Sequence, residues 1–297
     1  MRVALVVVLG LVMSGCAVTR RDAEEPVENR GPRQSQAEEV LKPSEVLKPK
    51  SREIASPSTD KFYMRGVYFP ASVETEIQLD SASGVPGTLL SAEDDLGLDD
   101  KVDLGRMDFS IRMARRHNVR VDFFKLNRFS QDVLPRDIEF GDFTFDEGTN
   151  FRAKLDWRVL TLTHTYSFFQ NERLEAGVGL GIHLIEAHAE GMEPGTNNRE
   201  AADEVGIFPT INGIFSWRIT KRFAFTARAL WFSAAPEEFD GTMSEYHADV
   251  QFRATNNLAV GLGYTKMSTE LQVFDAEDPL LFNLNTAGPE VFIRFSF

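Results

Sequence analysis

The chain has 297 residues, 42% of them hydrophobic, with 32 lysines and arginines against 45 aspartates and glutamates. A formal net charge of −13 argues against a nucleic-acid-binding surface, which needs a basic stripe. The single cysteine excludes a disulfide framework and a thiolate metal site. No apolar run long enough for a transmembrane helix follows Gly15, so a helical membrane protein is excluded as well.

The first residues have the pattern of a secretory signal. Met1 and Arg2 supply positive charge, and the apolar run that ends at Met13 is too short to span a bilayer. The next residues, Ser14-Gly15-Cys16, resemble the lipobox of bacterial lipoproteins, although Met13 stands where a lipobox usually has leucine. The resemblance implies a signal peptide over residues 1–15 and a lipid on Cys16. It also implies transport of the mature protein to the outer membrane; the alternative is an ordinary signal peptide.

Residues 16–60 have the composition of a disordered tether. The stretch has no aromatic residue, contains five prolines and mixes acidic with basic side chains. Such a segment cannot bury enough apolar surface to offset the entropy lost on ordering. We therefore expect a lipid-anchored periplasmic tether here, followed by a single folded domain over residues 61–297.

Alternation of polar and apolar residues recurs through residues 61–297, as around Arg106 and again from Phe151 to Val159. This period of two is typical of β-strands, whose successive side chains point to opposite faces. A soluble sandwich places the apolar face in its core, whereas a membrane barrel turns the apolar face to lipid. Alternation alone does not separate these two folds.

The connections between the candidate strands favour the barrel. Short turns such as 116–118 and 220–222 alternate with longer loops, which is the habit of bacterial outer-membrane barrels. We predict an all-β, antiparallel, up-and-down transmembrane barrel of about ten strands, or eight. The ten candidate strands are 62–80, 104–115, 119–131, 150–168, 174–190, 206–219, 223–235, 243–254, 258–274 and 286–297.

The C-terminus carries an alternating apolar row that ends on an aromatic residue: Val291, Ile293, Phe295 and Phe297. The row resembles the recognition signal of outer-membrane barrels, which implies the barrel-assembly machinery as a partner during biogenesis. In such a barrel the 24 phenylalanines are expected at lipid-facing positions and interface girdles.

Acidic residues concentrate in the longer loops, on the side that we expect to be extracellular. The densest group is Glu93, Asp94, Asp95, Asp99 and Asp100. Its oxygen ligands suit Ca²⁺ or Mg²⁺, which could bridge to lipopolysaccharide phosphates, but the spacing is not that of an EF-hand. Solvated acidic loops are the preferred interpretation, so we predict no resident cofactor.

A ten-stranded barrel is narrow enough for side chains to fill its interior, and charges buried there must be paired. We therefore predict a closed lumen of ion pairs rather than an open pore. The predicted lumen residues are Arg106, Asp108, Arg112, Arg120, Asp122, Arg152, Lys154, Asp156 and Arg158.

Two kinds of outer-membrane barrel enzyme have characteristic catalytic residues. Omptin proteases use paired aspartates and an Asp–His pair at the outer rim; His247 and Asp249 share a face, but no matching aspartate pair is evident. Barrel lipid A deacylases use a histidine and a serine two positions apart, whereas His164 and Ser167 are three apart and point to opposite faces. We interpret His247 and Asp249 as one more lumen pair.

The sequence therefore predicts a monomeric, non-catalytic outer-membrane lipoprotein in contact with membrane lipid and lipopolysaccharide, with a structural or adhesive role. An envelope enzyme of either kind above, or a narrow solute channel, is the alternative.

Overall fold

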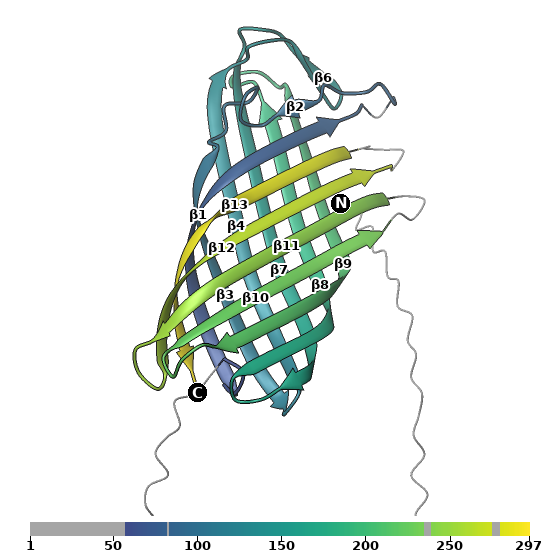
Figure 1. Cartoon of the computed structure of the whole chain (residues 1–297). Helices are drawn as coiled ribbons and strands as arrows, with labels where there is room; N and C mark the ends of the chain where they lie inside the picture. The colour runs from purple at the N-terminus through teal and green to yellow at the C-terminus, as the bar shows by residue number, and fades with distance from the viewer. Residues whose placement is uncertain (1–56, 82, 235–238, 275–279) are drawn as a thin grey trace, which may run out of the picture. The chain divides into compact units, whose positions relative to one another are not determined.

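Ten long antiparallel strands form a closed barrel (Figure 1). The computed structural model describes residues 57–81, 83–234, 239–274 and 280–297. The strand order is β13-β12-β11-β10-β9-β8-β7-β4-β3-β1, and pairing of β13 with β1 closes the sheet. The predicted all-β, up-and-down barrel of ten strands is confirmed. In the described residues, no helix is long and apolar enough to cross a membrane.

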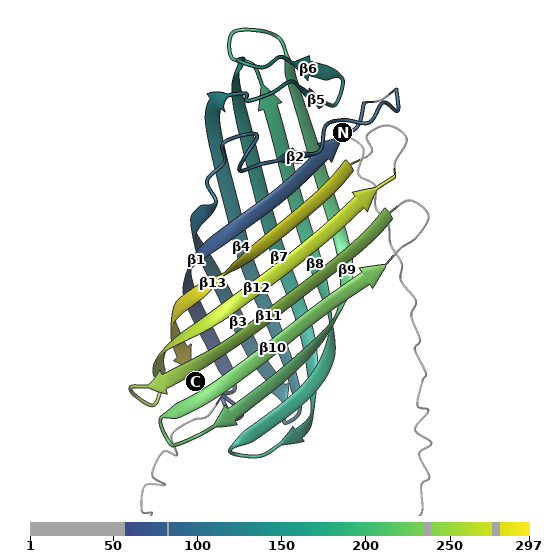
Figure 2. The same cartoon turned by 45° about the horizontal axis from the view of Figure 1, so that its top comes forward.

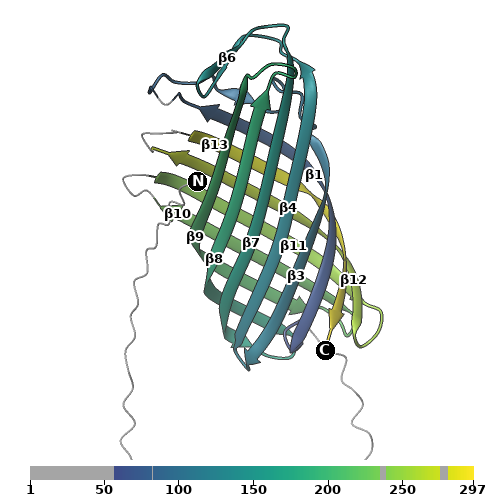
Figure 3. The ribbon, with the colours of Figure 1, turned by 180° about the vertical axis from the view of Figure 1, so that it is seen from behind.

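The barrel strands follow the chain in order around the wall, as Figures 2 and 3 show from two further directions. They are β1 (Phe62–Leu79), β3 (Lys101–Ala114), β4 (His117–Val133), β7 (Asn150–Gln170), β8 (Leu174–Met192), β9 (Arg199–Arg218), β10 (Phe223–Ala234), β11 (Phe239–Arg253), β12 (Leu258–Val273) and β13 (Leu280–Ser296). The short strands are β2 (Leu90–Ser91), β5 (Ile138–Phe140) and β6 (Phe143–Phe145).

Short connections lie at one end of the barrel, called the turn end here, and long ones at the other, the loop end. The chain enters β1 and leaves β13 at the turn end, where Lys61 N donates to Phe297 O at 3.0 Å. Several strands run further toward the loop end than predicted: β9 begins at Arg199 rather than residue 206, and β13 at Leu280 rather than residue 286. Part of the stretch between the predicted strands 174–190 and 206–219 is therefore strand.

Each face of the barrel wall reverses its polarity part-way along the strands, which β7 shows most clearly. Toward the turn end, Leu160 and Leu162 face outward and are 44% and 47% exposed, while Thr161 faces inward and is buried. Toward the loop end, Trp157 faces inward and is fully buried, while the next residue, Arg158, lies on the outer face with its side chain 43% exposed. The apolar side is outside in one half and inside in the other.

The reversal recurs around the wall. On β8 the outward residues change from Leu184 to Glu186, while the inward residues change from His183 to Ile185. We call the outward apolar ring of the turn-end half the apolar band and the loop-end half the collar. The band includes Met107, Ile111, Phe123, Leu160, Leu162, Val178, Leu180, Ile182, Ile211, Phe215, Val250, Leu262, Val291, Ile293 and Phe295.

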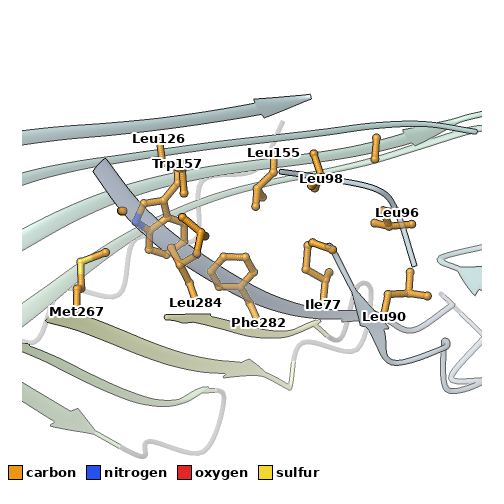
Figure 4. Close-up of a cluster of buried hydrophobic side chains, with 14 of the residues drawn as sticks. Ile77, Leu90, Leu96, Leu98, Leu126, Leu155, Trp157, Met267, Phe282 and Leu284 are labelled. Atoms are coloured by element: carbon orange, nitrogen blue, oxygen red, sulfur yellow. The ribbon is translucent and has the colours of Figure 1, made fainter. Parts of the chain in front are cut away.

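Apolar side chains fill the interior of the collar (Figure 4). Trp157 stacks on Phe282 from the far wall, with ring centroids 4.9 Å apart, and Met267 packs in the same cluster. The loop after β2 contributes Leu96 and Leu98 to this cluster, so this loop covers the interior of the barrel at the loop end.

The hairpin β5–β6 completes this closure. Its Phe145 packs edge-on against Phe151 of β7 at 4.9 Å, and Ile138 and Phe140 are buried with it. The collar thus has apolar residues inside and polar residues outside, as a water-soluble domain does. Burial of this apolar surface stabilises the collar through the hydrophobic effect.

The residues just before β1 belong to the barrel rather than to the predicted tether. Ser58 is 1% and Asp60 5% exposed, and Gln170 donates to Ser58 O at 2.6 Å. The predicted boundary at residue 60 is therefore wrong by a few residues, because Asp60 is bonded to two lumen arginines. The predicted signal peptide, Cys16 and tether residues 16–56 lie outside the described residues.

Candidate functional site in the barrel lumen

The turn-end half of the lumen holds a network of buried ions, whose centre is Arg65 of β1. Arg65 Nη1 lies 3.0 Å from Asp249 Oδ2 and 3.1 Å from His247 Nε2, and Arg65 Nη2 bonds Glu290. The Arg65 side chain is 3% exposed, so these contacts replace its hydration. Asp108 lies on the other side, 4.0 Å from Arg65 Nε and 3.5 Å from Arg228 Nη1. A buried charge is tolerated only with partners of this kind.

A second cluster lies between Arg65 and the apolar core. Arg106 Nε donates to both carboxylate oxygens of Asp122, at 2.8 and 3.0 Å, and Arg106 Nη2 bonds Glu245. Arg106 and Asp122 lie on the neighbouring strands β3 and β4, whereas Glu245 lies on β11, so the bond between Arg106 and Glu245 crosses the lumen. His183 of β8 is fully buried nearby, where Thr161 contacts its Nε2 at 3.4 Å.

Two further clusters close the turn end. Asp60 Oδ2 accepts from Arg253 at 2.7 Å and from Arg294 at 2.9 Å. Arg112 donates to both oxygens of Glu175, at 2.8 and 2.9 Å. Both arrangements are charge-assisted and well directed, so they tie the wall together at the end where the chain enters.

Five of the nine predicted lumen residues face inward in the structure: Arg106, Asp108, Arg112, Arg120 and Asp122. The other four, Arg152, Lys154, Asp156 and Arg158, were predicted wrongly, because they lie on the outer face of β7 in the collar. There Lys154 bonds its neighbour Asp156 at 2.9 Å and Arg158 bonds Glu186 at 3.2 Å. The reason is the reversal of polarity, which places the apolar partners of these residues inside.

Sequence reasoning missed several inward charges that organise the lumen, and three of them are Arg65, Glu245 and Glu290. None of these three is among the predicted lumen residues. All three fit the alternation of their strands, so a strict count of faces from the turn end would have found them. Their mutual proximity was not readable, because Arg65 and Glu290 are 225 residues apart in the chain.

The residues His247 and Asp249 form a buried pair, not a site at the rim. His247 Nε2 lies 2.7 Å from Asp249 Oδ2, and Thr265 Oγ1 lies 3.0 Å from His247 Nδ1. With Glu290 they form the one group among the described residues whose donor atoms are close enough to hold a metal. The guanidinium of Arg65 already bonds all three, so an organic cation takes the place that a metal would need.

The acidic group after β2 does not assemble into a cation site in the described structure. Glu93 bonds Arg128 at 2.5 Å and accepts from Thr75 N at 2.9 Å. Asp95 accepts from Arg136 Nε at 2.9 Å and from Arg136 Nη2 at 2.8 Å. The Arg136 guanidinium holds the pKa of Asp95 below its usual value, against the opposing effect of burial.

The five predicted cation ligands thus have separate roles. Among the described residues, no metal-ligating group includes Glu93, Asp94, Asp95, Asp99 or Asp100. Glu93 and Asp95 instead fasten the loop of residues 90–98 over the collar core, because their arginine partners belong to β4 and to the loop that precedes β5.

The predicted separation of His164 and Ser167 is present in the structure. His164 faces outward beside His117, with His117 Nδ1 3.1 Å from His164 Nε2. Ser167 faces inward, is fully buried and donates to Glu175 at 2.5 Å. The two side chains cannot act together as base and nucleophile.

Two cavities in the described part of the lumen are small. One, beside Arg106 and Asp122, has about 10 Å³ open to the centre of a water molecule. The other, beside Arg120 and Arg228, has about 20 Å³. A single water needs roughly 10–15 Å³ by this measure. Neither cavity accommodates a peptide, a sugar or an acyl chain.

Comparison with known proteins agrees with this architecture. No protein-family model matches the sequence, and no curated protein matches it either. The fold is similar to that of the outer membrane protease OmpT of Escherichia coli, with a TM-score of 0.52 and 10% identity over 83% of this chain and 99% of OmpT. The chain has the fold of an outer-membrane β-barrel.

Other outer-membrane barrels align less well. The transport unit of the autotransporter AIDA-I of Escherichia coli gives a TM-score of 0.41 with 8% identity, covering 84% of this chain and 92% of that one. OprG of Pseudomonas aeruginosa gives 0.34 with 11% identity, covering 80% and 96%.

Proposed function

We propose that this protein is a non-catalytic surface protein of the bacterial outer membrane, with a structural or adhesive role. The observation that supports it best is the double closure of the barrel, by the ion network around Arg65 in one half and by the apolar core around Trp157 in the other. The two lumen cavities, beside Arg106 and beside Arg120, are each about the size of one water molecule. The part of the barrel that could contact a partner outside the membrane is the collar, whose outer face carries polar and charged side chains.

In this function the apolar band lies in the membrane and the collar lies in the extracellular solvent. An apolar outer surface is stable in lipid, whereas the collar's outward charges, such as Arg158 and Glu186, are stable in water. The tether at the turn end then lies in the periplasm, with Cys16 lipidated. The partners that we propose are membrane lipid, lipopolysaccharide and, through the row that ends at Phe297, the barrel-assembly machinery. The barrel acts as a monomer.

Bilayer recordings test the closed lumen. Pure protein in planar bilayers should give no steady conductance at moderate voltage, whereas stable single-channel steps would establish a solute channel. The variant Trp157→Ala together with Phe282→Ala removes the core and should also give no conductance, if it still migrates as a heat-modifiable barrel, because the ion network around Arg65 still closes the turn-end half. Binding of whole cells with and without the protein to host matrix or to one another measures the adhesive role.

The enzyme alternative rests on the fold shared with OmpT, which is a protease. The enzyme alternative is disfavoured because His247 and Asp249 lie on the turn-end side of the apolar core and both bond Arg65. A peptide would have to displace that core to reach them. Mass spectrometry of lipid A and of a peptide library, with wild-type and deletion cells, tests it; an altered acyl pattern or new cleavage products would overturn the proposal.

Replacement of Cys16 by alanine tests the anchor. Labelling with radioactive palmitate should be lost in that variant, while the barrel still assembles and shows heat-modifiable migration on a detergent gel. Retained labelling would refute the lipobox interpretation.

A further inference from the structure

The larger lumen cavity has an unusual lining. It lies in the turn-end half, between β4, β9 and β10, and two guanidinium groups border it, those of Arg120 and Arg228. Its other polar lining residues carry hydroxyl or amide groups, among them Asn118 and Asn212, and no carboxylate is part of the lining. The remaining lumen clusters all contain acids, so this cavity is electrostatically distinct from them.

Two asparagines of the lining, Asn118 and Asn212, accept hydrogen bonds through their amide oxygens. Ser110 donates to the amide oxygen of Asn118 at 2.5 Å, and Thr165 donates to the amide oxygen of Asn212 at 2.8 Å. These bonds orient both amides, so their nitrogen atoms remain as donors. Asn212 is 6% exposed, and its Nδ2 is buried without a hydrogen-bond partner. A buried amide donor in this condition costs free energy unless something accepts from it.

Arg120 is in the same condition. Its Nη1 is buried without a hydrogen-bond partner, and no salt bridge joins it to a carboxylate of the described chain. Asp122 bonds Arg106 at 2.8 Å, and Asp108 lies 3.5 Å from Arg228, so Arg228 has a carboxylate partner whereas Arg120 has none among the described residues. The buried Arg120 guanidinium therefore lacks a counter-ion, and a negative charge in the cavity would supply one.

We propose that this cavity binds one monatomic anion such as chloride, held by Arg120, Arg228 and the amide nitrogen of Asn212. The ligand class follows from the donors, which are cationic or neutral N–H groups with no acid among them. The size follows from the volume of about 20 Å³, which takes one water-sized particle and excludes phosphate or a carboxylic acid. The site is internal, so it serves the stability of the barrel and not transport.

Bromide replaces chloride and is visible by anomalous scattering, so the direct experiment is a crystal of the full chain grown in sodium bromide. An anomalous peak in hydrogen-bond contact with Arg120 Nη1 and Asn212 Nδ2 is expected. A cavity that holds only water, bridging Arg120 to the unpartnered Oδ1 of Asp108, would show density without an anomalous peak and would overturn the proposal.

Thermal unfolding in detergent gives an independent readout. At constant pH and ionic strength, replacing gluconate by chloride should raise the unfolding temperature of the wild-type chain by about 2–4 °C, because a ligand that binds only the folded state stabilises it. Arg120→Gln should lose this chloride effect. Asn212→Asp should lose it too while unfolding at a higher temperature than wild type in gluconate, since the new carboxylate supplies the missing negative charge.

The matched control is Arg158→Gln, which removes an exposed arginine from the outer face and should keep the full chloride effect. Absence of any chloride effect in the wild-type chain, or an undiminished effect in both Arg120→Gln and Asn212→Asp, would contradict the site.

Discussion

The indole of Trp157 stacks on the ring of Phe282 across the interior of the barrel, with centroids 4.9 Å apart and planes inclined at 15°. The two residues belong to β7 and β13, which are not neighbours in the sheet. The wall therefore makes contact with itself through its own side chains. Nothing else has to enter the barrel at this level to close it.

Replacing Trp157 with alanine should destabilise the protein by about 3–5 kcal/mol, because the cavity left between facing walls cannot collapse easily. Denaturant unfolding in detergent, followed by tryptophan fluorescence and gel shift, measures it. Trp231→Ala is the control, since Trp231 faces outward and is 52% exposed. Equal losses in the two variants would show that the interior stack has no special role.

Removing the charge of Arg65 should destabilise the protein about as much as replacing Trp157 with alanine. Arg65→Met leaves Asp249 and Glu290 buried without their cation, and breaking a buried ion pair in this way costs about 3–5 kcal/mol. The triple variant with Asp249→Asn and Glu290→Gln should recover much of the loss, because it also removes the unpaired charges. Arg158→Met, which breaks an exposed pair, should cost about 0–1 kcal/mol. A stable Arg65→Met single variant would argue against the network as a structural unit.

The close approach of β7 and β8 requires glycine at position 179. A Cβ there would overlap His164 O and lie 2.7 Å from Thr165 Cα, which are backbone atoms that cannot yield without moving the strand. Gly179→Ala should therefore cost about 1–3 kcal/mol. Gly105→Ala is the control, because a Cβ at Gly105 meets nothing within 4 Å. Both variants can be compared by unfolding midpoint, and an unaffected Gly179→Ala would refute the steric argument.

The contact between Asp95 and Arg136 predicts a small pH dependence. The hydrogen bond to Arg136 lowers the pKa of Asp95 below 3.8, so the carboxylate adds stability above that value and loses it as the pH falls through the lower, folded-state pKa. The Arg136 side chain is 48% exposed, so the contribution is about 0–1 kcal/mol. The difference in unfolding free energy between wild type and Asp95→Asn should be present at neutral pH and vanish in strong acid. A difference that grows on acidification has the wrong sign for this mechanism.

Much of the fold was readable from local sequence. The alternation of polar and apolar residues located all ten barrel strands, and turns such as that after Ala114 separated short connections from long ones. Both signals depend only on neighbours along the chain, since a strand's two faces and a turn's backbone are local properties. The separation of His164 from Ser167 was readable for the same reason.

The lumen was only partly readable, because alternation says that two faces differ and not which face is inside. Which face turns inward depends on the medium around the barrel, and that medium changes along one strand: Leu160 belongs to the apolar band, whereas Arg158 belongs to the polar collar. Arg158 was therefore assigned to the lumen, although Trp157 occupies it. The sequence by itself determined the strands and the composition of their faces. Only the closed tertiary structure decided which face is interior and joined Arg65 to Asp249, because ring closure brings together residues that are 184 positions apart.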